Sequence, residues 1–427
     1  MRRFRLHDPG FEASFRTFVN ERRETPNDVE TIVANVLDTV RREGVAAVLR
    51  YSREFDGATD NVDTLRLSAS QIADGAAGCE PDVRDAIAFA AERIRRYHER
   101  QRPANAGFVD DSGVELGWRW TPLDSVGIYV PGGRAAYPST VLMNAIPAAV
   151  AGVGRIAMVT PPGRIQPAVL AAAKQAGITE IWRVGGAQAV AALAFGASPI
   201  HPVDKIVGPG NAFVTAAKRR VYGVVGIDAL AGPSEIVVVA DAINDPAWIA
   251  ADLLSQAEHD PGAQSILMTD DEAFAASVER EVAIQLETLT TKADASESWR
   301  AHGAIVITPL EETPRLVDLI APEHVAFALD HPERLADRVR HAGAIFLGRH
   351  TPEAIGDYVA GSNHVLPTSR AARFSSGLSM YDFLKRTSIV KCDAAAFATL
   401  GPPTVTLALA EGLPAHARSA SIRLNRQ

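Results

Sequence analysis

Cysteine is scarce in this chain, and that scarcity excludes several kinds of site. Cys79 and Cys392 are the only two cysteines among 427 residues, and they lie far apart in the sequence. A disulfide framework, a CxxC redox pair and a cysteine-rich structural zinc site are therefore excluded. Long apolar runs are also missing. Because a membrane helix needs about 18 or more consecutive apolar residues, no transmembrane span is expected.

Positive charge is limited as well. The chain has 43 basic and 51 acidic residues, which gives a net charge of −8, and it has no block of lysine and arginine. Neither nucleic acid nor an anionic membrane is therefore expected as its main partner. The basic residues 1–8 lead into no apolar stretch, so no signal peptide is predicted and a cytoplasmic location is expected.

The composition that remains is that of a soluble globular protein with large cores. Hydrophobic residues make up 47% of the chain and charged residues 22%, which are ordinary proportions for this class. At about 150 residues per domain, the length predicts two or three domains. The first hundred residues have mainly helical patterns, and 28–41 and 82–102 are the clearest helices. The region after about 380 is expected to form a small tail of helix and short strands.

Between about 125 and 307, short β-branched runs alternate with alanine-rich helical stretches. Strands are expected at 126–130, 155–160, 180–184 and 205–207, and again at 235–240, 265–269 and 304–307. This alternation predicts βαβ units and parallel sheets covered by helices on both faces. The predicted fold class is α/β, with two doubly wound modules joined near Gly232.

Three glycine-containing turns follow predicted strands and precede predicted helices. They are Pro131-Gly132-Gly133, Gly185-Gly186-Ala187-Gln188 and Gly208-Pro209-Gly210-Asn211. The backbone N–H groups at such helix starts can face an anion, and all three turns would lie at the carboxyl edge of one sheet. Each turn alone is common, so a nucleotide site and three ordinary turns remain alternatives. Gly152-x-Gly154 follows a helix and precedes a strand, which indicates a helix end rather than a dinucleotide fingerprint.

Gln256 and His259 are the first pair of residues that could bind a metal. They lie three residues apart near the end of the helix predicted over 246–259, so both project from its inward face. A carboxamide and an imidazole are costly to bury without partners. They are either a satisfied polar pair or two ligands of a metal such as zinc.

Glu323 and His324 follow Pro322, which suits the first turn of a helix. Neighbouring residues on a helix point about 100° apart, so the two side chains could act as separate bases on different sides of a substrate. The alternative is a glutamate favoured by the helix dipole beside an incidental histidine.

Two further segments carry possible ligands. Residues 351–353 predict a short helix that delivers Asp357, and Asn363 and His364 follow it. Glu411 and His416 offer a carboxylate and an imidazole in the tail. Either segment alone would be interpreted as a surface feature.

Together these segments resemble the histidinol dehydrogenase family. The resemblance rests first on Ile227-Asp228-Ala229-Leu230-Ala231-Gly232-Pro233-Ser234-Glu235-Ile236 and its spacing to Leu254-Ser255-Gln256-Ala257-Glu258-His259. It extends from about residue 25 to the C-terminus and includes the motifs at 129–133, 208–211, 322–324, 356–358 and 374–377.

The resemblance implies a zinc-dependent enzyme that oxidises L-histidinol to L-histidine. Two NAD⁺ would be consumed through an aldehyde-level intermediate, in the last step of histidine biosynthesis. One Zn²⁺ per subunit and a homodimer with an active site shared between subunits are also implied. Glu411 and His416 would then serve the partner's site.

The resemblance also assigns roles to individual residues. His324 would be the base that removes the alcohol proton, and Glu323 would activate the water that adds to the aldehyde. The implied zinc ligands are Gln256, His259, Asp357 and His416. The implied NAD⁺ contacts are Tyr129, Gln188 and Asn211. The implied substrate contacts are Ser234, Gln256, His259, His324, Asp357, Glu411 and His416.

The family architecture inserts one α/β module into another. The expected division is an N-terminal helical segment at 1–21, a first α/β domain at 22–127 and 236–378, a second, NAD-binding α/β domain at 128–235, and a dimer-forming tail at 379–427.

Three other functions are weighed against this one. A paralogue that oxidises another hydroxyl compound, such as a sulfonated diol, would keep the same zinc and base residues, but Glu411 and His416 retain the histidinol-type pattern. A zinc hydrolase with Glu323 as base is disfavoured by the three glycine turns and Tyr129. A non-catalytic binding module is disfavoured because the adjacent Glu323 and His324 would have no role in it.

Overall fold

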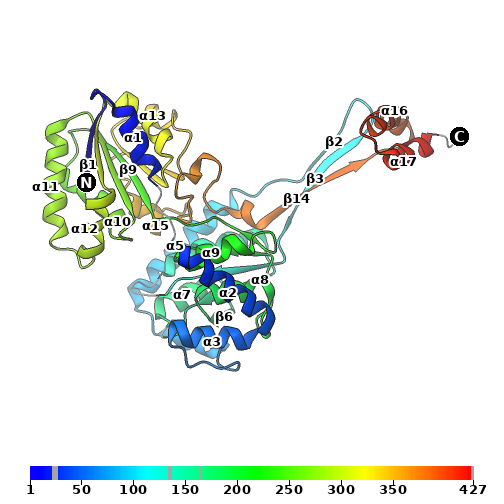
Figure 1. Ribbon diagram of the computed structural model, residues 1–427, viewed down its shortest axis with the longest axis horizontal. Helices are drawn as coiled ribbons and strands as arrows, with labels where there is room; N and C mark the ends of the chain where they lie inside the picture. Colours follow the sequence, from blue (N-terminus) through cyan, green and yellow to red (C-terminus); the bar gives the residue numbers. More distant parts are fainter. Residues whose placement is uncertain (22–26, 133–136, 164, 425–427) are drawn as a thin grey trace.

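The computed structural model describes residues 1–21, 27–132, 137–163 and 165–424. Two parallel sheets, each covered by helices on both faces, form the body, and a long antiparallel ribbon extends from it (Figure 1). The predicted α/β class with parallel sheets is confirmed. Among the described residues, no helix combines the length and apolar character needed to cross a membrane.

The larger sheet has six parallel strands. Their order is β1 (Arg2–Arg5), β11 (Ala304–Ile307), β10 (Gln264–Thr269), β9 (Glu235–Ala240), β12 (His324–Ala328) and β13 (Ala344–Leu347). Every residue of β9 is buried, as expected for a central parallel strand with helices on both sides. The sequence predicts helix for the first hundred residues, but Arg2–Arg5 form the edge strand β1 beside β11.

Alternate residues of β9 pack into two cores, because successive side chains of a strand point to opposite faces. Ile236 and Val238 share a core with one set of helices, and Val237 and Val239 share a core with another. The first set is α10 (Pro246–Ala257), α11 (Glu272–Leu286) and α12 (Lys292–His302). The second includes α1 (Phe11–Asn20), α13 (Thr313–Ile320) and α14 (Glu333–Ala336).

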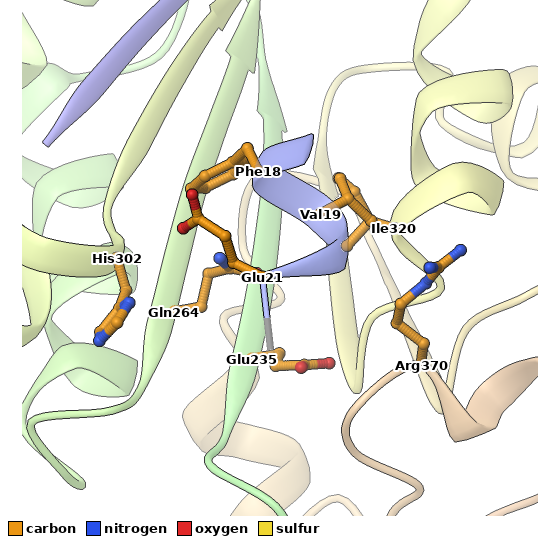
Figure 2. A pocket seen from close by; sticks show the side chains of 8 residues that line it. All are labelled: Phe18, Val19, Glu21, Glu235, Gln264, His302, Ile320 and Arg370. Atoms are coloured by element: carbon orange, nitrogen blue, oxygen red, sulfur yellow. The ribbon is translucent and has the colours of Figure 1, made fainter. Parts of the chain in front are cut away.

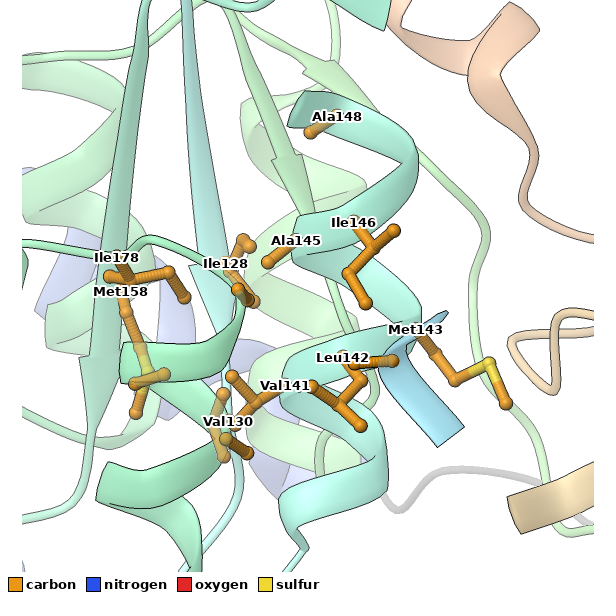
Figure 3. Packing of buried hydrophobic residues seen from close by; sticks show 14 of the residues in the cluster. Ile128, Val130, Val141, Leu142, Met143, Ala145, Ile146, Ala148, Met158 and Ile178 are labelled. Carbon is orange, nitrogen blue, oxygen red and sulfur yellow. The ribbon is translucent and has the colours of Figure 1, made fainter. Parts of the chain in front are cut away.

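The smaller sheet has five parallel strands. Their order is β6 (Glu180–Arg183), β5 (Arg155–Thr160), β4 (Ser125–Tyr129), β7 (Lys205–Val207) and β8 (Gly226–Ile227). One face packs against α4 (Ala69–Ala77), α5 (Pro81–Glu99), α6 (Pro138–Ala151) and α7 (Pro167–Gln175). Figure 3 shows side chains of α6 meeting Ile128 and Met158 of this sheet. The other face packs against α2 (Asn27–Glu43), α3 (Val45–Asp56), α8 (Gly186–Phe195) and α9 (Ala212–Val221).

The helices between 27 and 99 thus share their cores with the five-stranded sheet, whereas β1 and α1 pack on the six-stranded sheet. The division of the chain into domains stays a prediction. The turns expected after β4, β6 and β7 do follow those strands and precede α6, α8 and α9, although Gly133 lies outside the described residues. Gly152 ends α6 with a φ of 94°, which confirms its interpretation as a helix end.

The ribbon consists of β2 (Ala106–Val109), β3 (Glu115–Pro122) and β14 (Leu384–Lys391), paired antiparallel in the order β14-β3-β2. It carries α16 (Ala394–Ala410) and α17 (Pro414–Leu424) at its far end, well away from both sheets (Figure 1). The remaining short elements are α15 (Glu353–Tyr358) and the 3-10 turns Leu310–Glu312, Ala371–Arg373 and Met380–Phe383. We call β2, β3, β14, α16 and α17 the arm.

Candidate active site

His324 is the first residue of β12 and lies at the amino end of the six-stranded sheet. The predicted helix start at Pro322 is wrong: α13 ends at Ile320, and Ala321 adopts the left-handed conformation with a φ of 52°. A helix cannot continue through that residue into Pro322, so the chain turns and enters the sheet between β9 and β13. The His324 side chain is almost fully buried as a result, with 3% of the residue exposed.

The ring of His324 is oriented by the backbone of the neighbouring strand. Its Nδ1 lies 3.1 Å from the carbonyl oxygen of Glu235. Because a carbonyl can only accept, this contact places the proton of the neutral ring on Nδ1 and leaves the lone pair of the neutral ring on Nε2. Nε2 is buried and has no hydrogen-bond partner within the described part of the chain.

Three carboxylates surround this imidazole. Glu353 Oε1 lies 3.4 Å and Glu323 Oε2 lies 3.7 Å from Nδ1, whereas Asp357 Oδ1 lies 3.7 Å from Nε2. Glu353 and Asp357 lie four residues apart on α15, so both point from one face of the helix. Glu323 Oε2 also accepts a hydrogen bond of 3.0 Å from the backbone N–H of Glu235.

The carboxylates shift the proton affinities of the whole cluster. Burial lowers the pKa of His324, but the negative charges of Glu353, Glu323 and Asp357 outweigh burial and raise this pKa to about 10. Burial also raises the pKa of Glu323 to about 7 and that of Glu353 to about 8. Burial alone would raise the pKa of Asp357, yet the adjacent His324 lowers it. Two buried carboxylates and one partly buried carboxylate therefore surround one imidazole.

Gln256 reaches the same cluster from the last turn of α10. It is fully buried, and its amide is best oriented with the nitrogen donating to Glu353 at 2.8 Å. His259 follows the end of α10, is exposed, and lies close enough to Asp357 to lower the pKa of that carboxyl. The structure thus brings Gln256, Asp357 and His324 together, with His259 nearby.

The geometry of the cluster suits a cation. Ligand atoms of His324, Glu353 and Asp357 lie within 4.8 Å of one another. In the described residues, no lysine or arginine forms an ion pair with these carboxylates, so their charge is compensated by histidine alone. Buried carboxylates are expensive without compensation, and binding a metal is one way to supply it.

Glu353 is the residue of this cluster that the sequence analysis did not assign to the site. The sequence feature that could have identified it is its position four residues before Asp357, because residues four apart lie on the same face of a helix. His364, which follows α15, packs beside them, with its Nδ1 donating to the backbone oxygen of Asp357 at 2.9 Å.

Glu411 and His416 lie far from this cluster within the same chain. Both are exposed near the junction of α16 and α17, at the end of the arm (Figure 1).

Ser234 immediately precedes β9, and its backbone oxygen accepts a hydrogen bond from the N–H of Gln264. It therefore lies at the same amino edge of the sheet as His324.

The expected cofactor residues lie at the carboxyl edge of the five-stranded sheet. Tyr129 ends β4, and its hydroxyl accepts a hydrogen bond of 3.0 Å from the N–H of Gly186. Gln188 lies in the first turn of α8 and is 1% exposed. Asn211 caps α9 by accepting hydrogen bonds from the N–H groups of Phe213 and Val214. Tyr129 and Asn211 thus also stabilise the backbone of the turns after β6 and β7.

A separate cavity of about 200 Å³ opens at the amino ends of β9 and β10 (Figure 2). Glu235, Gln264 and Arg370 contribute to its wall. None of the residues assigned to the site by the sequence analysis lines it.

Comparisons with known proteins show the family to which the chain belongs. The family model described as histidinol dehydrogenase matches residues 19–424. A histidinol dehydrogenase from Caulobacter vibrioides is 74% identical over 99% of both chains, and one from Rhodospirillum rubrum is 59% identical over 97% of both. A crystal structure of histidinol dehydrogenase from Elizabethkingia anophelis superposes with a TM-score of 0.93 at 37% identity, covering 99% of this chain and 98% of that one. The chain is an oxidoreductase of the dehydrogenase type and belongs to the histidinol dehydrogenase family.

Proposed function

We propose that this protein oxidises L-histidinol to L-histidine in two successive steps, each of which reduces one NAD⁺. The single observation that carries this proposal is the buried His324, whose Nε2 has no partner among the described residues and faces Asp357. The reaction would complete histidine biosynthesis in the cytoplasm, a compartment that keeps free cysteines such as Cys79 and Cys392 reduced.

His324 acts as the general base in the first step. Its Nδ1 is held by the backbone oxygen of Glu235 at 3.1 Å, so Nε2 accepts the hydroxyl proton as the hydride leaves for NAD⁺. Glu323 acts in the second step and deprotonates the water that adds to the aldehyde. The two side chains are consecutive in sequence but make different contacts, which allows separate roles.

Zinc is the metal that best suits the donors available. Gln256, His259 and Asp357 supply nitrogen and oxygen ligands without thiolate, which is compatible with Zn²⁺. When bound, zinc would orient the imidazole and amine of the substrate. A cation against Asp357 also cancels part of the negative charge that raises the pKa of His324, and a base must be neutral.

The arm supplies the remaining site residues to a second copy. Glu411 and His416 are exposed at the end of a ribbon that leads away from both sheets of their own chain (Figure 1). Val109 and Val390 on the ribbon and Leu407 on α16 are each more than 60% exposed, which is typical of a surface covered by a partner. We therefore assign Glu411 to substrate binding and His416 to zinc binding in the active site of a homodimer partner.

We assign the cofactor to the carboxyl ends of β4, β6 and β7. Tyr129, Gln188 and Asn211 lie at or near these ends, at the carboxyl edge where open parallel sheets bind nucleotides. Ser234 lies at the edge of the other sheet, beside His324, and contacts the substrate.

The test is the amount of NADH formed per L-histidinol consumed by purified, zinc-loaded protein. Two equivalents are expected, and this activity should disappear with a chelator and return with Zn²⁺. The matched control is the same assay with ethanol in place of L-histidinol. One equivalent would contradict the second oxidation, and no NADH would refute the proposed substrate.

A further inference from the structure

Asp56 lies on a helix that packs on the five-stranded sheet, and it contacts Gln188, one of the residues expected to bind the cofactor. It is the last residue of α3, and its Oδ2 accepts a hydrogen bond of 3.1 Å from Nε2 of Gln188. The neighbouring Gly186 donates its N–H to the hydroxyl of Tyr129 at 3.0 Å. Burial raises the pKa of Tyr129 to about 12, and the negative charge of Asp56 adds to this increase. Asp56 therefore interacts with two of the three residues that we assign to the cofactor.

The position of Asp56 is unfavourable for the stability of the helix that carries it. A carboxylate at the C-terminus of a helix is repelled by the negative end of the helix dipole, where cations are preferred. Partial burial of the carboxyl group raises its pKa, and the hydrogen bond from Gln188 offsets only part of this increase. In the described residues, no lysine or arginine forms an ion pair with Asp56, so neither helix stability nor charge pairing explains its presence.

Together, the side chains of Asp56 and Gln188 present more acceptors than donors. Oε1 of Gln188 is buried and has no hydrogen-bond donor in the part of the chain that the structure describes, although the residue is 1% exposed. Gln188 Nε2 is the one side-chain donor to Asp56 among the described residues, and it reaches Oδ2. The pair is therefore suited to a ligand that brings hydroxyl donors.

We propose that Asp56 is the residue that selects NAD⁺ over NADP⁺, by accepting hydrogen bonds from the hydroxyls of the adenosine ribose. This inference rests on the proposed use of NAD⁺ at these turns. Adjacent ribose hydroxyls satisfy a carboxylate, which is how acidic residues recognise this group in nucleotide-binding sheets. NADP⁺ has a phosphate in place of one hydroxyl, so it loses a donor and brings a negative charge against the carboxylate.

The experiment compares kcat/KM for NAD⁺ and for NADP⁺, with L-histidinol as substrate, in Asp56→Asn and Asp56→Ser. Because hydrogen bonds to a charged group are strong, kcat/KM for NAD⁺ is expected to fall about tenfold or more. The value for NADP⁺ should stay the same or rise, since the repulsion is gone. Glu54→Gln is the matched control, because it removes the same charge from the same helix two residues away.

Two readouts separate this inference from the proposed function. Thermal unfolding should show that both Asp56 variants remain folded, as expected for substitutions at an exposed residue. Titration with NADH and NADPH, followed by tryptophan fluorescence, measures nucleotide preference without any turnover. Failure of the wild-type protein to oxidise L-histidinol would refute the proposed substrate and leave this titration valid. An NADH/NADPH preference within about twofold of wild type in both Asp56 variants would overturn the role of Asp56.

Discussion

Lys218 and Asp228 form a buried ion pair beside the five-stranded sheet. Disrupting this pair tests how much it contributes to the stability of the protein. The two side chains are 3% and 4% exposed. Both also hold Gly208, the first residue of the turn before α9: Asp228 accepts its N–H at 2.7 Å, and Lys218 donates to its carbonyl oxygen at 3.0 Å. Gly208 has a φ of 109°, and a Cβ there would lie 2.2 Å from the backbone carbonyl oxygen of Tyr129. The pair thus fixes a turn that only glycine can form.

Lys218→Met keeps most of the side-chain volume and removes the positive charge. Asp228 is then buried with one backbone hydrogen bond and no cation, and removing one partner of a buried pair costs about 3–5 kcal/mol. Lys218→Met combined with Asp228→Asn leaves neither charge unpaired. The double variant should therefore be more stable than Lys218→Met alone, by about 2 kcal/mol or more.

Urea unfolding followed by tryptophan fluorescence measures these differences, because Trp182 is buried in the same core as α9. Lys174→Met is the matched control. Lys174 is exposed at the end of α7, and its substitution should change the free energy of unfolding by less than about 0.5 kcal/mol. A loss below about 1 kcal/mol for Lys218→Met would show that the pair contributes little and would refute the reasoning.

Four further substitutions address the site and its surroundings. His324→Asn should lower the rate of alcohol oxidation by about 10²-fold or more without loss of bound zinc; alcohol oxidation at the wild-type rate would remove His324 as the base. Glu323→Gln should slow aldehyde oxidation more than alcohol oxidation, since only the former needs an activated water, and equal losses would contradict this division. Burial raises the pKa of Asp252 to about 6, so the folded state binds the proton more tightly than the unfolded state and stability falls as the pH rises from about 4 to above 6. Asp252→Asn should therefore increase the melting temperature of zinc-free protein at pH 8 and have little effect at pH 4; the same increase at both pH values would be inconsistent with this explanation. Gly356→Ala places a Cβ 2.4 Å from the ring of Phe346, so α15 must shift, and both stability, by about 1–3 kcal/mol, and zinc affinity should fall; unchanged values of both would show that α15 tolerates the shift.

The parallel sheets could be predicted because their strands are continuous β-branched runs, such as the fully buried β9. β1 could not, since Arg2–Arg5 carries three arginines and becomes a strand through long-range pairing with β11. The expected tail of helix and short strands after about 380 fits β14, α16 and α17. The pairing of β14 with β3 was not predicted, for the same reason as β1, because the two strands lie more than 250 residues apart in the chain. Pairing partners so distant in sequence leave no local pattern.

The candidate site shows the same division between local and long-range information. Residue type and spacing made Gln256 and Asp357 possible ligands but left a structural role open for each, and only the family resemblance assigned them to one site. The structure brings both to one cluster around His324. The short apolar run after Glu323 fits a helix or a strand equally well, and only its place between β9 and β13 decides for the strand. Glu353 could have been found, because residues four apart share a helix face, but its burial against His324 depends on how α15 packs.

Because the end of the arm lies far from the body of its own chain (Figure 1), the proposed dimer predicts that two inactive variants can restore activity to each other. If each active site combines the body of one chain with the arm of another, damage to the two parts should complement. Chains carrying His324→Asn and chains carrying Glu411→Ala would each be inactive alone. Mixed dimers would contain one intact site and one doubly damaged site. Co-expression in equal amounts should therefore restore about a quarter of the wild-type activity, because half of randomly assembled dimers are mixed and each has one working site of two.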